Sequence, residues 1–128
     1  MRTLALMIVS LFGTILLAQQ GEASHPNTPP AKSTFLVIYK PGPAWLPGKP
    51  MAEQPLREHG KYMLSLYSRG ELKIAGPFSD ETGGAVVLNV ASDADAKNIV
   101  AKDPAVVTGV FVYELHPWGL VDWASLKK

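Results

Sequence analysis

The 128-residue sequence contains no cysteine, which excludes disulfide bonds, a thiolate nucleophile and cysteine-ligated metal sites. Neither sign of charge dominates, because 12 lysine and arginine residues balance 11 acidic residues and leave a formal net charge of +1. Without a basic run or a basic helix face, the sequence offers no electrostatic basis for binding nucleic acid. The three histidines, His25, His59 and His116, lack the spacing of metal ligands. We therefore expect neither a metal site nor a cofactor.

The sequence also lacks an apolar run long enough to span a bilayer. The run from Leu4 to Ala18 has 15 residues, whereas a membrane-spanning helix needs about 20. It follows Arg2 and precedes the small residues Gly21 and Ala23, which is the pattern of a secretory signal peptide, here residues 1–23. An uncleaved anchor helix is the alternative. We expect a secreted or periplasmic protein without stable membrane association after cleavage.

The chain beyond residue 23 divides into three segments. Residues 24–33 contain three prolines and little that could be buried, so they predict a flexible linker. Residues 34–118 carry alternating strand and helix patterns and are long enough to form one domain. Residues 119–128 form a C-terminal tail whose structure the pattern leaves open.

Four strands and two helices are predicted within the domain. The strands cover residues 34–40, 71–78, 85–91 and 106–118, and the helices cover residues 52–69 and 92–103. Apolar positions at Leu56, Met63, Leu66 and Tyr67 share one face of the first helix. Ser92 begins the second helix with a serine-x-x-acid capping pattern. The order β-α-β-β-α-β predicts an α+β, ferredoxin-like domain with two helices on one face of an antiparallel sheet.

Both faces of the predicted sheet are apolar. In the third strand Val86, Leu88 and Val90 alternate with Ala85 and Val87, and in the last strand Val107, Phe111, Tyr113 and Leu115 alternate with Val110 and Val112. Two helices can cover only one face, and a large bare apolar face is rare on a monomer. We therefore predict a homodimer joined sheet to sheet.

An ionisable residue occupies the apolar side of each predicted helix. His59 lies between Leu56 and Met63, and Asp103 ends the second helix on the side of Ile99. The predicted topology brings both to the same end of the sheet. A carboxylate is unfavourable at a helix C-terminus and costly to bury alone. A neighbouring imidazole would relieve both problems, and the pair could serve as an acid–base dyad.

The same end of the sheet collects further candidates. Trp45, in the proline-rich loop 41–50, could roof a pocket above the dyad, and Gly76 and Pro77 end the second strand beside it. Two plainer interpretations stay open. The histidine and aspartate could be a structural pair that ties two helix ends together, and Trp45 could be an ordinary core residue.

The ordered set of these residues resembles the YciI-like, or YCII-related, proteins. The resemblance covers residues 34–118 and rests on His59, Gly70-Glu71-Leu72, Gly76-Pro77, Asp103-Pro104 and Pro117-Trp118. It implies a dimeric α+β barrel and makes His59 and Asp103 a candidate active-site dyad. A dehydrochlorinase of aromatic degradation is a known enzyme of that family.

Three functions remain under consideration. The first is an exported enzyme in which His59, held by Asp103, performs a metal-free elimination or isomerisation on a small aromatic or lactone-like molecule. The second is a noncatalytic module that binds a small ligand in the same cleft. The third is a haem site with His59 as the axial ligand.

Overall fold

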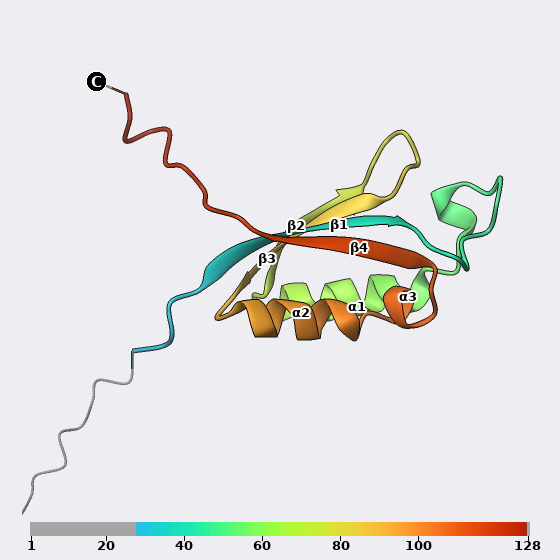
Figure 1. The fold of residues 1–128 in the computed structure, drawn as a ribbon, viewed down its shortest axis with the longest axis horizontal. Helices are drawn as coiled ribbons and strands as arrows, with labels where there is room; N and C mark the ends of the chain where they lie inside the picture. Colours follow the sequence, from blue (N-terminus) through green and yellow to red (C-terminus); the bar gives the residue numbers. More distant parts are fainter. Residues whose placement is uncertain (1–27, 128) are drawn as a thin grey trace, which may run out of the picture.

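The computed structural model describes residues 28–127. The signal peptide predicted for residues 1–23 and the first part of the predicted linker lie outside the described residues. Four strands form one antiparallel sheet in the order β2-β3-β1-β4, and helices cover one of its faces (Figure 1). The strands are β1 (Ser33–Pro41), β2 (Leu72–Pro77), β3 (Gly84–Val90) and β4 (Phe111–Pro117), and the helices are η1 (Met51–Glu53), α1 (Arg57–Ser68), α2 (Asp93–Ala101) and α3 (Pro104–Val107). The α+β, ferredoxin-like architecture is confirmed.

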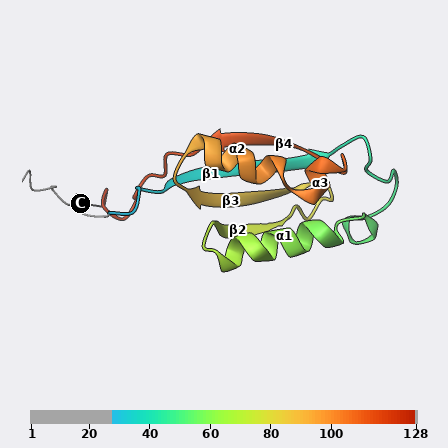
Figure 2. The same ribbon diagram turned by 90° about the horizontal axis from the view of Figure 1, so that it is seen from below.

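Strand alternation places the core between the sheet and the helices. In β1, Phe35, Val37 and Tyr39 are buried, whereas their neighbours Leu36 and Ile38 are only half-buried on the other face. Helix α1 covers the β2 side of the sheet and α2 covers the other side (Figure 2). Side chains from all four strands and from α1, α2 and α3 meet in this layer: Phe35, Val37, Tyr39, Leu66, Leu72, Val86, Leu88, Val90, Ala96, Val100, Ala105 and Phe111.

No helix formed by residues 28–127 is both long enough and apolar enough to cross a membrane.

The first predicted helix is divided in the structure. Met51–Glu53 forms the short 3₁₀ helix η1, and α1 begins only at Arg57. Pro55 lies between them and has no backbone N–H with which to continue a helix. The placement of Tyr67 on the buried face is wrong, because this residue is largely exposed while its neighbour Leu66 is fully buried. The broad apolar stripe of the sequence overestimated the width of the buried face.

The predicted boundaries at Asp103 are also wrong, and this correction bears on the site. Helix α2 ends at Ala101, and Asp103 is the N-cap of a separate short helix, α3. The last strand begins at Phe111 instead of residue 106. Val107 therefore lies in α3 and is exposed, where alternation had placed it in the sheet. The Asp103-Pro104 pair explains the change, since an aspartate N-cap followed by proline starts a helix as readily as it stops one.

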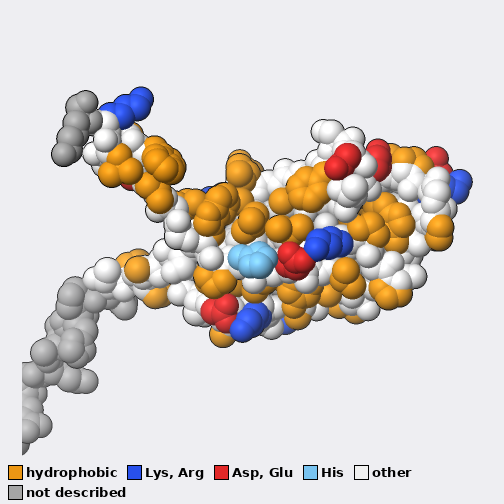
Figure 3. All heavy atoms as spheres, turned by 45° about the horizontal axis from the view of Figure 1, so that its top comes forward, with side chains coloured by type: hydrophobic (Ala, Val, Ile, Leu, Met, Phe, Trp, Pro, Cys, Tyr) orange, Lys and Arg blue, Asp and Glu red, His pale blue; other side chains and the backbone are white. Residues whose placement is uncertain are grey.

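The sheet face opposite the helices has no covering layer within the described chain. Apolar side chains lie along it around a short charged row, as the space-filling view shows (Figure 3). Leu36, Ile38, Val87 and Val112 belong to the apolar part by their register. The charged row consists of Lys40, Glu114 and His116. Glu114 lies at its centre, where it pairs with Lys40 and lies 3.5 Å from the Nε2 of His116. We call this surface the outer face.

Candidate active site

His59 projects from the first turns of α1 toward the end of β1. Its Nδ1 lies 2.9 Å from Oδ1 and 2.8 Å from Oδ2 of Asp103. The imidazole edge also packs against two aromatic rings, with centroids 5.4 Å from both Tyr39 and Phe111. The structure thus brings together the two residues that the topology had placed at one end of the sheet.

Asp103 is completely buried, with 0% of its surface exposed. Its Oδ1 accepts a hydrogen bond from the Ala105 backbone N–H at 2.9 Å, which is the N-cap bond of α3. Its Oδ2 accepts from the hydroxyl of Tyr39 at 2.8 Å. A buried carboxyl group needs such partners because desolvation alone would be costly. Three elements, β1, α1 and α3, therefore converge on one side chain.

Tyr39 is the member of this cluster that sequence reasoning missed. Burial, followed by the neighbouring Asp103 carboxylate and the hydrogen bond to it, raises the pKa of the Tyr39 hydroxyl far above its ordinary value. The hydroxyl consequently remains a donor to Asp103 at all physiological pH values. A usable signal was present, because alternation from Phe35 and Val37 places Tyr39 on the helix-covered face at the same end of the sheet.

The network determines what His59 can do. The hydroxyl and the backbone N–H can only donate to Asp103, so its carboxylate acts as an acceptor, and Nδ1 of His59 completes the set as a third donor. This arrangement fixes the tautomer in which Nδ1 carries hydrogen. In the neutral ring, Nε2 is then an unprotonated nitrogen that can accept a proton. The ring is 17% exposed, so it remains accessible.

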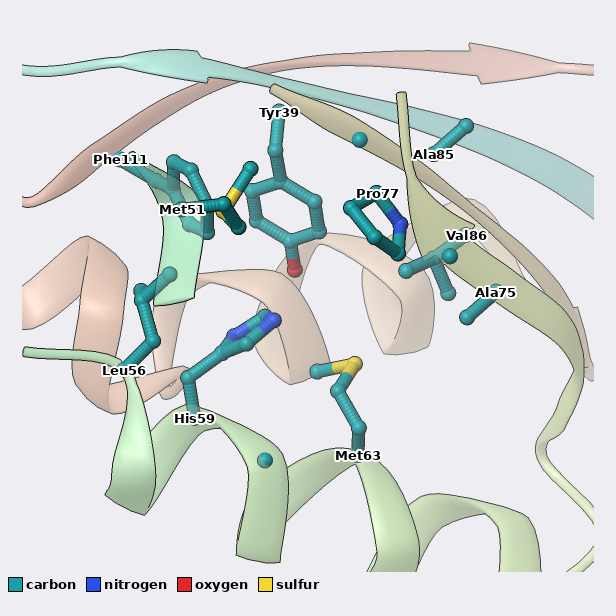
Figure 4. A pocket seen from close by; sticks show the side chains of 13 residues that line it. Tyr39, Met51, Leu56, His59, Met63, Ala75, Pro77, Ala85, Val86 and Phe111 are labelled. Atoms are coloured by element: carbon teal, nitrogen blue, oxygen red, sulfur yellow. The ribbon is translucent and has the colours of Figure 1, made fainter. Parts of the chain in front are cut away.

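The accessible side of His59 faces a cavity of about 250 Å³ between α1 and the sheet. Figure 4 shows the imidazole below the Tyr39 ring, with Met51 and Met63 on either side and Pro77 across the opening. The lining residues are Tyr39, Met51, Leu56, His59, Gly60, Met63, Ala75, Gly76, Pro77, Gly84, Ala85, Val86 and Phe111. Only Tyr39 and His59 bring an oxygen or nitrogen in their side chains, so the cavity suits a small, largely apolar molecule.

The remaining predicted pocket residues fall into two groups. Gly76 and Pro77 line the cavity at the end of β2. Trp45 does not line it, and its ring instead packs against Phe111 with centroids 5.7 Å apart. This placement matches the interpretation of Trp45 as a packing residue.

Two glycines that line the cavity leave space in different ways. At Gly60, no atom lies within 4 Å of the position that a Cβ would take. At Gly84, a Cβ would lie only 2.7 Å from the carbonyl oxygen of Gly76, so a side chain would collide with the backbone of β2.

A tethered loop forms one end of the cavity. Gln54 is nearly buried and holds the proline-rich segment by accepting from the Leu46 N–H and donating to the carbonyls of Leu46 and Lys49. The Met51 N–H donates to Glu81, in the β2–β3 turn, at 2.6 Å. The two contacts place Met51, whose side chain lines the cavity, between the loop and the turn.

The family model of the YCII-related domain matches residues 34–119. The chain belongs to the YCII-related family. It is 37% identical over 62 residues to the uncharacterized protein YjpA of Bacillus subtilis strain 168, a match that covers 48% of this chain and 73% of that protein. Both His59 and Asp103 lie inside the matched YCII-related domain. No group of three or more histidine, aspartate or glutamate side chains within residues 28–127 could hold a metal ion.

Proposed function

We propose that the cavity binds a small, mostly apolar organic molecule and that His59 acts on it as a general acid–base. The observation that carries this proposal is the position of the imidazole. One ring nitrogen is held by a fully buried carboxylate, and the ring forms part of the wall of an apolar cavity. A histidine held in one tautomer and exposed to a cavity matches the requirements of proton transfer.

The reaction class that fits is a metal-free elimination or isomerisation. Nε2 of His59 would remove a proton from a carbon made acidic by an adjacent carbonyl or ring. The electron pair of that C–H bond would then either form a double bond as a leaving group departs or accept the same proton at another carbon. The apolar lining and the YCII-related resemblance support a small aromatic or lactone-like substrate.

A noncatalytic ligand-binding module is the second candidate, and one observation favours it. The hydroxyl of Tyr39 is already engaged with Asp103, so His59 is the only side chain of the lining with a nitrogen or oxygen left for a ligand. Enzymes that stabilise a developing oxyanion normally supply further donors. On this alternative the cleft would retain a ligand without changing it.

The two candidates are separated by an unbiased screen of small metabolites against the purified protein. Each bound compound is incubated with the protein and then analysed by mass spectrometry. We expect a product whose formation falls about 10²–10⁴-fold in His59→Gln and also falls in Asp103→Asn. His25→Gln is the matched control, because His25 lies in the predicted linker, outside residues 34–118. Ligands that bind but are always recovered unchanged would establish the binding module, and unchanged activity in both dyad variants would leave the pair only a structural role.

We also propose that the protein is exported and works as a homodimer. The apolar outer face supports a dimer joined sheet to sheet, and the N-terminal pattern of Arg2, an apolar run and small residues supports secretion or transfer to a periplasm.

A further inference from the structure

The charged row on the outer face places one carboxylate between two basic groups. Glu114 forms an ion pair with Lys40 of the neighbouring strand, and its Oε2 lies 3.5 Å from the Nε2 of His116. All three side chains are about half exposed in the single chain. When the imidazole is neutral, the lysine and the glutamate cancel and the row has no net charge. When the imidazole is protonated, the row carries one net positive charge.

Apolar side chains are interleaved with the charged row. Each member of the row lies opposite an apolar residue of the neighbouring strand, in the pairs Lys40–Val112, Glu114–Ile38 and His116–Leu36. Strand β3, as described, adds Ala85, Val87 and Asn89 to the outer face and no ionisable side chain. Helix α3 packs against β4 from the other face, and its four residues include no ionisable side chain. A second copy that covers the apolar residues of this face (Figure 3) must therefore cover the charged row as well.

We propose that the charged row makes the homodimer dependent on pH, so that two copies associate while His116 is neutral and separate when it is protonated. This inference rests on the proposed sheet-to-sheet homodimer. An interface between two identical faces uses the same surface of both copies, so each dimer covers two charged rows. Covering two neutral rows leaves no unpaired charge in the interface. Covering two protonated rows would desolvate two uncompensated positive charges beside one another.

The charge of the row changes with His116 and with neither of the other two members. Histidine is the side chain that normally changes charge between pH 5 and pH 8, whereas lysine side chains remain protonated there. Hydrogen bonds from Lys40 and then from His116 hold the pKa of Glu114 below its ordinary value, so this carboxylate remains charged over the same range. Each copy must release one proton to join the dimer. The affinity should therefore decrease as pH falls, by up to about 100-fold per pH unit for two protons.

Sedimentation velocity over a concentration series at pH 7.5 and at pH 5.5 measures the dissociation constant of the dimer. We expect this constant to rise at least about tenfold at pH 5.5. His116→Gln should form a dimer of equal affinity at both pH values, and the control His25→Gln should keep the pH dependence of the unaltered protein.

The outcomes separate this inference from the homodimer itself. A dimer of equal or higher affinity at pH 5.5, or a pH dependence that persists in His116→Gln or is lost in His25→Gln, would overturn the inference and leave the homodimer standing. A protein that is monomeric at every concentration and at both pH values would overturn the homodimer and this inference with it.

Lys40→Met distinguishes the charge of the row from a general effect of acid on folding. Without the lysine, the row has one net negative charge while His116 is neutral and no net charge when it is protonated. We therefore expect the pH dependence to reverse, so that this variant dimerises more tightly at pH 5.5 than at pH 7.5. Methionine suits the apolar surroundings, and circular dichroism at both pH values checks that the variant is folded. A folded Lys40→Met dimer that still weakens at pH 5.5 would overturn the charged row as the origin of the pH dependence.

Discussion

Replacing Tyr39 by phenylalanine removes one hydroxyl and leaves the aromatic ring in place. The ring contacts with Phe111, at 5.2 Å, and with His59, at 5.4 Å, should persist. What is lost is the 2.8 Å hydrogen bond to Oδ2 of Asp103. Since Asp103 has no exposed surface, water cannot easily replace the donor. A hydrogen bond to a charged group contributes about 1.5–3 kcal/mol, so we expect Tyr39→Phe to lower the free energy of unfolding by roughly 2 kcal/mol.

Urea unfolding followed by circular dichroism measures this change. Tyr113→Phe is the matched control, because Tyr113 is half-buried on the next strand and its hydroxyl makes no hydrogen bond to another described residue. The control should cost less than about 0.5 kcal/mol. A double-mutant cycle with Asp103→Asn should give a coupling energy of at least about 1 kcal/mol. If Tyr39→Phe behaves like the control, or if the cycle shows no coupling, the reasoning about a shared buried carboxylate is refuted.

The pH dependence provides an independent check on the same residue. The folded-state pKa of Tyr39 is raised, whereas in the unfolded chain a tyrosine titrates near pH 10. The stabilising contribution is therefore complete below about pH 10 and is lost as pH rises above it, because only the unfolded state releases the proton. The expected slope is about 1.4 kcal/mol per pH unit for this one group. The stability gap between the native protein and Tyr39→Phe should narrow above pH 10, and a gap that stays constant to pH 11 would contradict the assignment.

Three further predictions concern the cavity, its loop and the outer face. Gly60→Ala should raise the free energy of unfolding by up to about 1 kcal/mol in urea titrations, because glycine is unfavourable within α1 and no atom lies within 4 Å of a Cβ at this position. The variant should bind its ligand more weakly, since the methyl group narrows the cavity. Unchanged affinity would place the ligand elsewhere. Gln54→Ala should abolish protection of the Leu46 N–H in hydrogen exchange, because Gln54 supplies its acceptor, while amides of β1 stay protected; retained protection of Leu46 would show that the loop is held by other contacts. Val112→Asp should produce a monomer in sedimentation, because the new carboxylate would be buried in the proposed sheet-to-sheet interface of the dimer. In the monomer it can pair with Lys40, which lies opposite residue 112 in the register. Val112→Thr is the control, and a dimeric Val112→Asp protein would argue against that interface.

The amino-acid pattern alone determined the architecture of the domain. Period-two alternation in residues 34–40 and 85–91, together with two helical stripes, was sufficient for the α+β assignment, because the burial of one face imposes that periodicity on the chain. The same pattern brought His59 and Asp103 to one end of the sheet. Each is an ionisable residue at an apolar position, and such a residue requires a partner that only the topology can supply.

Only the tertiary structure decided the details of the site. Locally, the Asp103-Pro104 pair is compatible with the end of one helix or the start of another. The burial of Ala105 in the core decides for the start of α3, and Asp103 is its N-cap. Tyr39 looked like one more core aromatic, since a hydroxyl near the end of a strand acquires a role only from the acceptor placed against it. The sequence left Trp45 open between a pocket roof and an ordinary core residue, because the path of the proline-rich loop depends on the side chain of Gln54. Sequence periodicity records which face of an element is buried, whereas contacts between residues as distant as 39, 59 and 103 exist only after the chain has folded.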